Sequence, residues 1–213
     1  MHEKLLFQIR QLHGRMHQSD APPQNQGEHQ AEFVINSVRE AILGLVMEGV
    51  TPRTLEISLF YHWLRLTTLR RGMTDEQFSA FSSDMGSVMG PLVKRLQEIE
   101  PTLPDTGPSE DMREMGVMIQ LIKDLFAASA AQALSWADIE RHADMTNRAA
   151  FSLVTEFLDN EINPALVENV LLYFWLRTST INANVAETFF QKLERHWDEV
   201  VKRVNPFMDD LLS

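Results

Sequence analysis

Residues 52–65 read PRTLEISLFYHWLR, and residues 164–177 read PALVENVLLYFWLR. The two stretches lie 112 positions apart. Between 51–68 and 163–180 the chain repeats Pro, Glu, Leu, Tyr, Trp, Leu, Arg and Thr, which is 8 of 18 positions. Self-similarity at a fixed offset is the sequence signature of a duplicated unit, and it has to be recognised before other patterns are interpreted. The sequence therefore predicts two copies of one unit.

The match continues downstream at the same offset without a gap. Seven apolar residues of 78–99 fall on seven apolar residues of 190–211, at steps of three and four that trace one helical face. Segments rich in Pro, Gly, Gln and Ser are typical of linkers. The expected organisation is a first copy at 1–101 containing a flexible linker at 18–30, an inter-copy linker at 102–112, and a second copy at 113–213.

Capping patterns predict where the helices begin. Thr51 and Asn163 each precede a proline, and their side chains can accept a hydrogen bond from a free backbone N–H of the first turn. A capping box is expected at 74–77, a similar pattern stands at 184–187, and residues 135–138 are a third start signal for a helix. The predicted helices of the first copy are 3–17, 31–48, 52–70 and 75–99. Those of the second copy are 110–133, 145–160, 164–181 and 184–210, with a short extra helix at 136–143.

The helices at 52–70 and 164–181 are apolar on nearly every side. A helix without a polar face is covered by other elements, so both are expected to be central. Two central helices related by duplication are expected to pack near a pseudo-twofold axis. The predicted fold is all-α, an internally duplicated helical bundle of about four helices per copy. Gly90-Pro91 is expected to kink or break the helix at 75–99.

Composition favours a cytoplasmic protein that binds neither nucleic acid nor membrane. The chain has 213 residues, no cysteine and a net charge of −11. Without cysteine, neither disulfide nor thiolate chemistry is available. Net acidity repels phosphate backbones and anionic lipid, and the apolar runs are far shorter than a membrane span.

Polar residues repeated in both central helices are candidates for a pocket between the copies. Two glutamates and two tyrosines facing one space could carry out acid–base chemistry or bind a ligand. The alternative is structural: buried polar side chains that bond to each other, with Glu56 to Arg177 and Glu168 to Arg65 as conceivable pairs. His62 breaks the repeat, because Phe174 stands at the related position. The pocket candidates are Glu56, Tyr61, His62, Arg65, Glu168, Tyr173 and Arg177.

A stripe of small residues is a candidate interaction surface. Ser79, Ser83, Ser87 and Gly90 follow helical spacing, whereas the related positions of the second copy carry long polar or charged side chains. Small exposed residues reduce helix propensity without a gain unless another helix packs closely on them. The stripe is therefore expected to be covered, by the first helix of the chain or by a second subunit.

Other patterns are weaker. His13 and His17 are spaced as two metal ligands on one helix would be, but no third ligand accompanies them. Residues 135–151 loosely fit a helix-turn-helix, although acidic residues follow on the would-be recognition helix. No phosphate loop, zinc-protease motif or nucleophile elbow is present in the sequence. No catalytic, cofactor or metal residue is predicted.

These observations favour a non-enzymatic adaptor or regulator that binds another protein or itself, with a homo-oligomer expected. One alternative is an enzyme or small-molecule binder with a pocket between the copies. A second is a DNA-binding regulator of the helix-turn-helix class. No sequence feature identifies a partner or a substrate.

Overall fold

The computed structural model describes residues 24–105, 123, 124, 127 and 134–213, and it confirms an all-helical chain within them. The predicted helix at 3–17, with His13 and His17, lies outside the described residues, as does most of 110–133. A short 3-10 helix covers Glu100–Thr102. The α-helices are α2 (Gln24–Met47), α3 (Pro52–Arg70), α4 (Asp75–Ser83), α5 (Gly86–Ile99), α7 (Trp136–Asp159), α8 (Pro164–Asn182), α9 (Glu187–Arg195) and α10 (Trp197–Leu211).

The helix boundaries recur at the offset found in the sequence. α2 and α7, α3 and α8, and α4 and α9 each begin and end 112 positions apart, and α5 and α10 end at the same offset. The residues with positive φ recur in the same way. Gly49 (φ 84°) is related to Glu161 (φ 51°), and Gly72 (φ 70°) to Asn184 (φ 50°). Each follows a helix end, where a left-handed residue closes the last turn.

Most of the predicted caps are confirmed. Thr51 and Asn163 accept hydrogen bonds from the backbone N–H groups of the first turns of α3 and α8. The capping box at Thr74 is complete, and Ser135 and Asp138 exchange the corresponding pair of bonds at the start of α7. The box expected at 184–187 is wrong. α9 begins at Glu187 behind Ala186, and Asn184 takes the left-handed conformation instead.

Several predicted boundaries differ from the structure. The helices expected at 75–99 and 184–210 are each two helices, divided at Asp84–Met85 and at His196, and Pro91 lies inside α5 without ending it. α2 begins at Gln24, so part of the expected linker is helical. Residues 136–159 form one continuous helix, so the turn required by a helix-turn-helix is absent there. The long apolar face of α7 packs against α2 and α3 and favours continuation of the helix.

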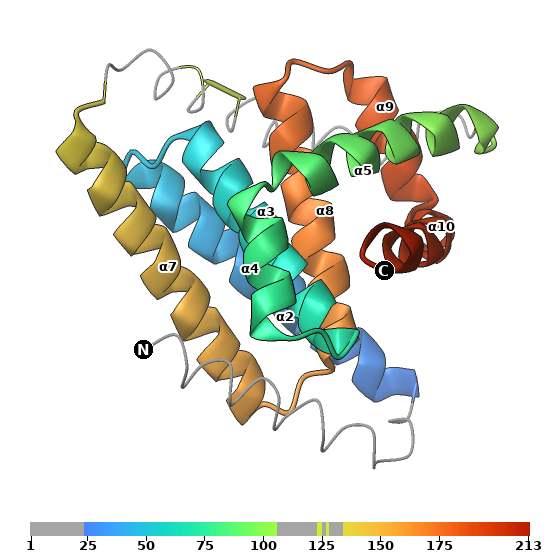
Figure 1. The fold of residues 1–213 in the computed structure, drawn as a ribbon, viewed down its shortest axis with the longest axis horizontal. Helices are drawn as coiled ribbons and strands as arrows, with labels where there is room; N and C mark the ends of the chain where they lie inside the picture. Colours follow the sequence, from blue (N-terminus) through green and yellow to red (C-terminus); the bar gives the residue numbers. More distant parts are fainter. Residues whose placement is uncertain (1–23, 106–122, 125–126, 128–133) are drawn as a thin grey trace.

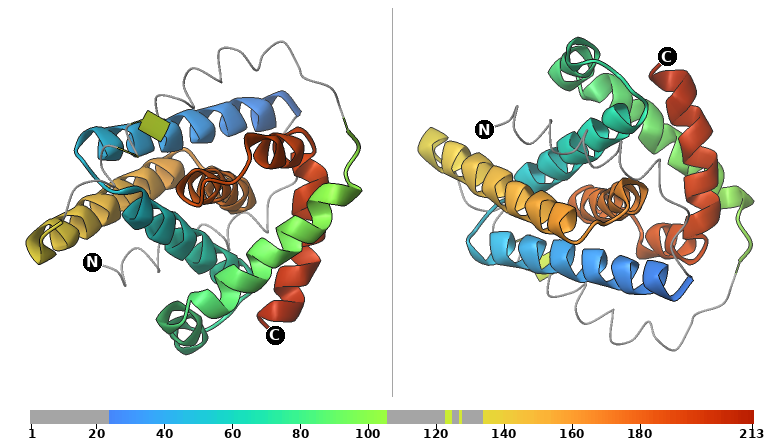
Figure 2. Two further views of the ribbon diagram at one scale, coloured as in Figure 1. Left: turned by 90° about the horizontal axis from the view of Figure 1, so that it is seen from above. Right: turned by 90° about the horizontal axis from the view of Figure 1, so that it is seen from below.

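The central pair of helices is α3 and α8, which pack against each other over much of their length. Figure 1 shows them crossing in the middle of the molecule, with α7 along one side and α5, α9 and α10 on the other. Seen from above, α8 is viewed nearly end-on and the other helices surround it (Figure 2). α2 and α7 pack on this pair and on each other, while α5 packs against α10. One apolar core includes residues of both halves.

Aromatic side chains fill the centre of this core. The indoles of Trp63 and Trp175, which are 112 positions apart, stack with centroids 6.3 Å apart and an interplanar angle of 10°. Phe60 contacts both rings, at 5.3 Å and 5.1 Å. All three residues are at most 1% exposed, and within the described part of the chain neither indole N–H has a hydrogen-bond partner. The centre of the contact between the two helices is therefore apolar and depends on packing.

Replacing Trp63 with alanine is expected to destabilise the fold by about 3–5 kcal/mol, because the surrounding side chains cannot close the cavity that remains. Trp136→Ala is the matched control, since that side chain is 74% exposed. Its expected cost is below about 0.5 kcal/mol. Urea unfolding followed by circular dichroism measures both. Similar costs for the two variants would contradict a core organised around the indole stack.

Candidate functional site

The two repeated glutamates are buried and bridge the halves of the chain. Glu168, near the start of α8, accepts a hydrogen bond from the Thr67 hydroxyl at 2.8 Å. It also pairs with Arg70 and, at 3.4 Å, with Arg71 at the end of α3. Glu56, near the start of α3, accepts a hydrogen bond at 2.7 Å from the Asn182 side chain at the end of α8. Each glutamate thus connects the beginning of one central helix to the end of the other.

The pairing conceived from the sequence, Glu56 to Arg177 and Glu168 to Arg65, is therefore not the one in the structure. Glu56 lies on the same helix as Thr67, the partner of Glu168, but 11 residues earlier. That separation is about 16 Å at 1.5 Å per residue. The two carboxylates lie toward opposite ends of the central pair, with the aromatic centre between them, and do not share a pocket.

Arg65 and Arg177 instead form one similar cluster in each half. The Arg65 guanidinium pairs with Asp75 at 2.5 Å and lies 4.3 Å from the centre of the Phe78 ring. The related cluster joins Arg177 to Glu187 at 2.8 Å and to the Phe190 ring at 4.4 Å. In both halves the arginine orients the start of the following short helix against the end of its central helix.

The tyrosines pack beside these clusters. Tyr61 contacts the Phe78 ring at 5.3 Å, and Tyr173 contacts the Phe190 ring at 5.5 Å. The Tyr173 hydroxyl also donates a hydrogen bond to Glu194. Burial, assisted by the negative charge of Glu194, raises the pKa of Tyr173 well above its usual range. Burial also raises the pKa of Tyr61, and the nearby Arg65 opposes that shift.

The small-residue stripe is exposed in the described chain. Ser79, Ser83, Ser87 and Gly90 all lie at the surface, and a β-carbon added at Gly90 would meet no atom within 4 Å. The stripe is also divided between two helices, because α4 ends at Ser83. The hydroxyls of Ser83 and Ser87 bond to backbone carbonyls of their own turns.

An open cleft of ≈ 950 Å³ lies between α3 and α7, beside the turn that joins α4 to α5. Its apolar lining includes Ile57 on α3, Met85 in the turn, and Ile139 and Phe151 on α7. Ile57 and Ile139 are 36% and 40% exposed. Polar lining comes from Tyr61 and His62 and from Asp144, Asn147 and Arg148, of which Asp144 and Arg148 form an ion pair.

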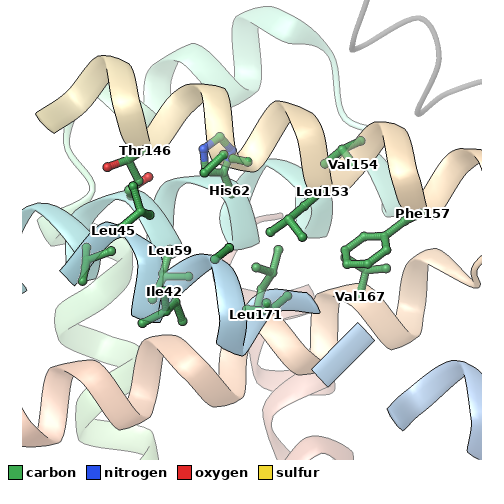
Figure 3. Close-up of a pocket in the computed structure, with 16 residues that line it drawn as sticks. Ile42, Leu45, Leu59, His62, Thr146, Leu153, Val154, Phe157, Val167 and Leu171 are labelled. Atoms are coloured by element: carbon green, nitrogen blue, oxygen red, sulfur yellow. The ribbon is translucent and has the colours of Figure 1, made fainter. Parts of the chain in front are cut away.

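A smaller apolar cavity of ≈ 60 Å³ lies between α2, α3, α7 and α8, and Figure 3 shows the side chains around it. Twelve of its 16 lining residues form pairs 112 positions apart. Ser58, His62, Thr146 and Ala149 complete the lining, and the first three also line the open cleft. The pairs are Val38 with Ala150, Ala41 with Leu153, Ile42 with Val154, Leu45 with Phe157, Leu55 with Val167 and Leu59 with Leu171.

Of the seven pocket candidates, the structure brings only Tyr61 and His62 together at the cleft. The other five serve the ion pairs and ring contacts described above. Sequence reasoning missed the residues of α7, because it predicts separate helices at 136–143 and 145–160 in place of one continuous helix that holds Ile139 and Ala143. Their spacing, with Phe151 two turns further on, was the available signal for an apolar face on one long helix.

Comparisons with protein families, with characterised proteins and with solved structures found no match. Among the described residues, no group of three or more His, Cys, Asp or Glu side chains is arranged to hold a metal ion. In the same part of the chain, no helix combines the length and apolar character needed to cross a membrane.

Glu168→Ala is expected to lower the free energy of unfolding by about 3 kcal/mol, because it removes the acceptor of the buried Thr67 hydroxyl and the carboxylate that pairs with Arg70. Arg71 keeps its pair with Asp209. Glu199→Ala is the control. Glu199 pairs with Arg203 at 2.7 Å on the surface, and such a pair contributes less than about 1 kcal/mol. Urea unfolding at neutral pH compares the two variants. Equal losses would mean that Glu168 contributes no more than a surface ion pair.

Stability is expected to fall as pH rises above about 10, the ordinary pKa of tyrosine, because the unfolded chain then releases protons that folded Tyr61 and Tyr173 retain. Below that pH the contribution is fully present. The loss reaches at most about 1.4 kcal/mol per pH unit for each tyrosine. Denaturant titrations between about pH 8 and pH 11 measure the slope, which Tyr173→Phe is expected to reduce. An unchanged slope would contradict the assignment to Tyr173.

Proposed function

We propose that the chain is an internal duplication whose halves pack about a pseudo-twofold axis through the Trp63–Trp175 stack. The sequence repeat, the recurring helix bounds and the paired left-handed residues support this proposal. The two arginine–phenylalanine clusters support it as well, because each contact in one half has a counterpart 112 positions away. If the two halves had arisen independently, each of these matching contacts and helix ends would need its own explanation.

We also propose that the protein is a non-enzymatic adaptor or regulator that acts by binding another protein. The open cleft between α3 and α7 is the observation that carries this proposal. Its apolar residues Ile57 and Ile139 remain substantially exposed, and the side chain of Trp136, three residues before Ile139 on α7, is also exposed. Exposed apolar side chains grouped in a groove between helices are typical of a site that receives an amphipathic helix.

The charge around the cleft indicates the chemistry of the partner. The chain carries a net charge of −11, and Asp84 and Glu140 lie exposed in the segments that border the cleft. Asp144 and Arg148 in the cleft lining form an ion pair, so their charges offset each other. A helix with an apolar face and basic flanks complements this surface, and opposite charges increase the association rate and select the partner.

The arrangement of the repeated ionisable residues favours binding over catalysis. Glu56, Glu168, Arg65 and Arg177 are engaged in ion pairs or hydrogen bonds that join helices. Burying and pairing these groups explains their presence in both halves without a reaction. We place the protein in the cytoplasm, as expected from its composition.

Self-association remains a proposal for the surface formed by Ser79, Ser83, Ser87 and Gly90. Its smooth, exposed face could pack closely on a second copy of the chain. Light scattering of the wild type and of the Ser83→Arg variant shows whether the protein self-associates and whether it does so through this surface. A dimer that the variant converts to a monomer supports the stripe as an interface, whereas a wild-type monomer removes this role.

A designed amphipathic peptide is expected to bind the cleft when Leu forms its apolar face and Lys flanks it. The same peptide with Glu in place of Lys is expected to bind at least about 10-fold more weakly, because the cleft is bordered by acids. Ile139→Asp is expected to weaken binding of the Lys peptide about 10-fold or more. Fluorescence polarisation with labelled peptides, at two salt concentrations, measures these affinities.

Ile35→Asp provides the matched control for this variant. Ile35 is 39% exposed on α2, the helix related to α7, and lies outside the cleft lining. The Ile35→Asp variant is expected to bind the Lys peptide with the same affinity as the wild type. Absence of binding, or equal effects of Ile139→Asp and Ile35→Asp, would contradict the cleft as the interaction site.

A further inference from the structure

The apolar cavity lies where the proposed pseudo-twofold axis would relate one half of the chain to the other. Six pairs of its lining residues are 112 positions apart, four between α2 and α7 and two between α3 and α8. Strict symmetry would make the two ends of such a cavity alike. The lining residues without a paired counterpart are therefore the ones that make its ends differ.

Three of those residues are polar where the other half is apolar. Ser58, His62 and Thr146 line the cavity, whereas the related positions carry Val170, Phe174 and Val34. Val34 and Val170 are buried in the core, and Phe174 packs against it. All three polar residues also line the open cleft, so the departure from the repeat occurs where the cavity meets the cleft.

The three polar residues, on α3 and α7, each border both the cavity and the cleft, whereas the lining surface of the cavity itself is almost wholly apolar. Figure 3 shows His62 and Thr146 toward one end of the cavity, with Phe157 and Val167 toward the other. The Thr146 hydroxyl donates a hydrogen bond at 2.7 Å to the backbone carbonyl of His142, which leaves its oxygen lone pairs available as acceptors. This hydrogen bond satisfies the Thr146 hydroxyl as a donor, so its burial at the edge of the apolar core costs little stability.

We propose that this cavity binds the alkyl chain of a small amphipathic molecule whose neutral polar end lies at Ser58, His62 and Thr146. The inference goes beyond the proposed protein interaction and needs no partner protein, but it rests on the proposed duplication. The ≈ 60 Å³ volume is roughly four times what one water requires, so a chain of about four carbons fits. A neutral end is favoured over an anion, because the protein is acidic and Arg148 is already paired with Asp144.

The test titrates the full chain with straight-chain alcohols from ethanol to octanol and follows the methyl NMR signals of the cavity-lining residues. Affinity is expected to rise about fourfold per methylene until the chain reaches about four carbons, and then to level off. Butanoate is expected to bind about 10-fold more weakly than butanol, because its charge would be desolvated at the junction.

Two variants separate a specific site from surface partitioning. Ala150→Leu fills the cavity and is expected to abolish the shifts, whereas Ala137→Leu, at an exposed position on the same helix, is expected to leave them unchanged. The triple change Ser58→Val, His62→Phe and Thr146→Val installs the residues of the other half. It is expected to lower butanol affinity about 10-fold while the chain remains folded.

Three results would overturn the proposal. These are affinity that keeps rising to octanol without a plateau, NMR shifts that survive Ala150→Leu, and no binding of any alcohol. The last would identify the cavity as a packing defect. Peptide binding at the cleft is measured separately, so failure of the alcohol test leaves the proposed interaction intact, and the converse also holds.

Discussion

The buried aromatic contact between the two central helices is the constraint on which the rest of the structure depends. Trp63 and Trp175 stack across it, Phe60 closes the same space, and none of the three is more than 1% exposed. Since no described residue accepts a hydrogen bond from the two indole N–H groups, the centre of the contact is stabilised by shape and apolar area. α2 and α7 pack on the surface that this central pair presents, and α5 packs against α10 beside it.

Buried polar interactions then fix how the central helices cross. Glu56 and Glu168 each reach the end of the opposite helix, so sliding one helix along the other would remove the Asn182 donor of Glu56 and leave Glu168 buried without its donors. Removing one partner of such a pair costs more than forming the pair contributes, which makes these contacts specific for one register. The glutamates, first considered for chemistry, thus have a structural role that accounts for their repetition.

Function in this protein is expected where the two halves differ. The arginine–phenylalanine clusters and the left-handed helix ends are alike in both halves. At the junction of cleft and cavity, by contrast, Ser58, His62 and Thr146 stand where the other half has apolar residues. If the chain is duplicated as proposed, structural requirements apply equally to both copies. A change confined to one half, next to an open cleft, is then a better guide to a binding site than the repeated residues.

The sequence by itself determined the helical class, the offset of the repeat and most of the caps, because these depend on local spacing and on side chains within one turn. It predicted α3 at its observed bounds and α8 to within one residue, since both begin with a capping residue before proline. Only the tertiary structure decided the partners of the glutamates, the continuity of α7 and the place of the cleft. Those depend on how helices distant in the sequence cross, and a change of a few ångströms in that crossing pairs different side chains. His62 stood out in the sequence as a departure from the repeat, but its position between a cleft and a cavity emerged only when α7 was packed against α3.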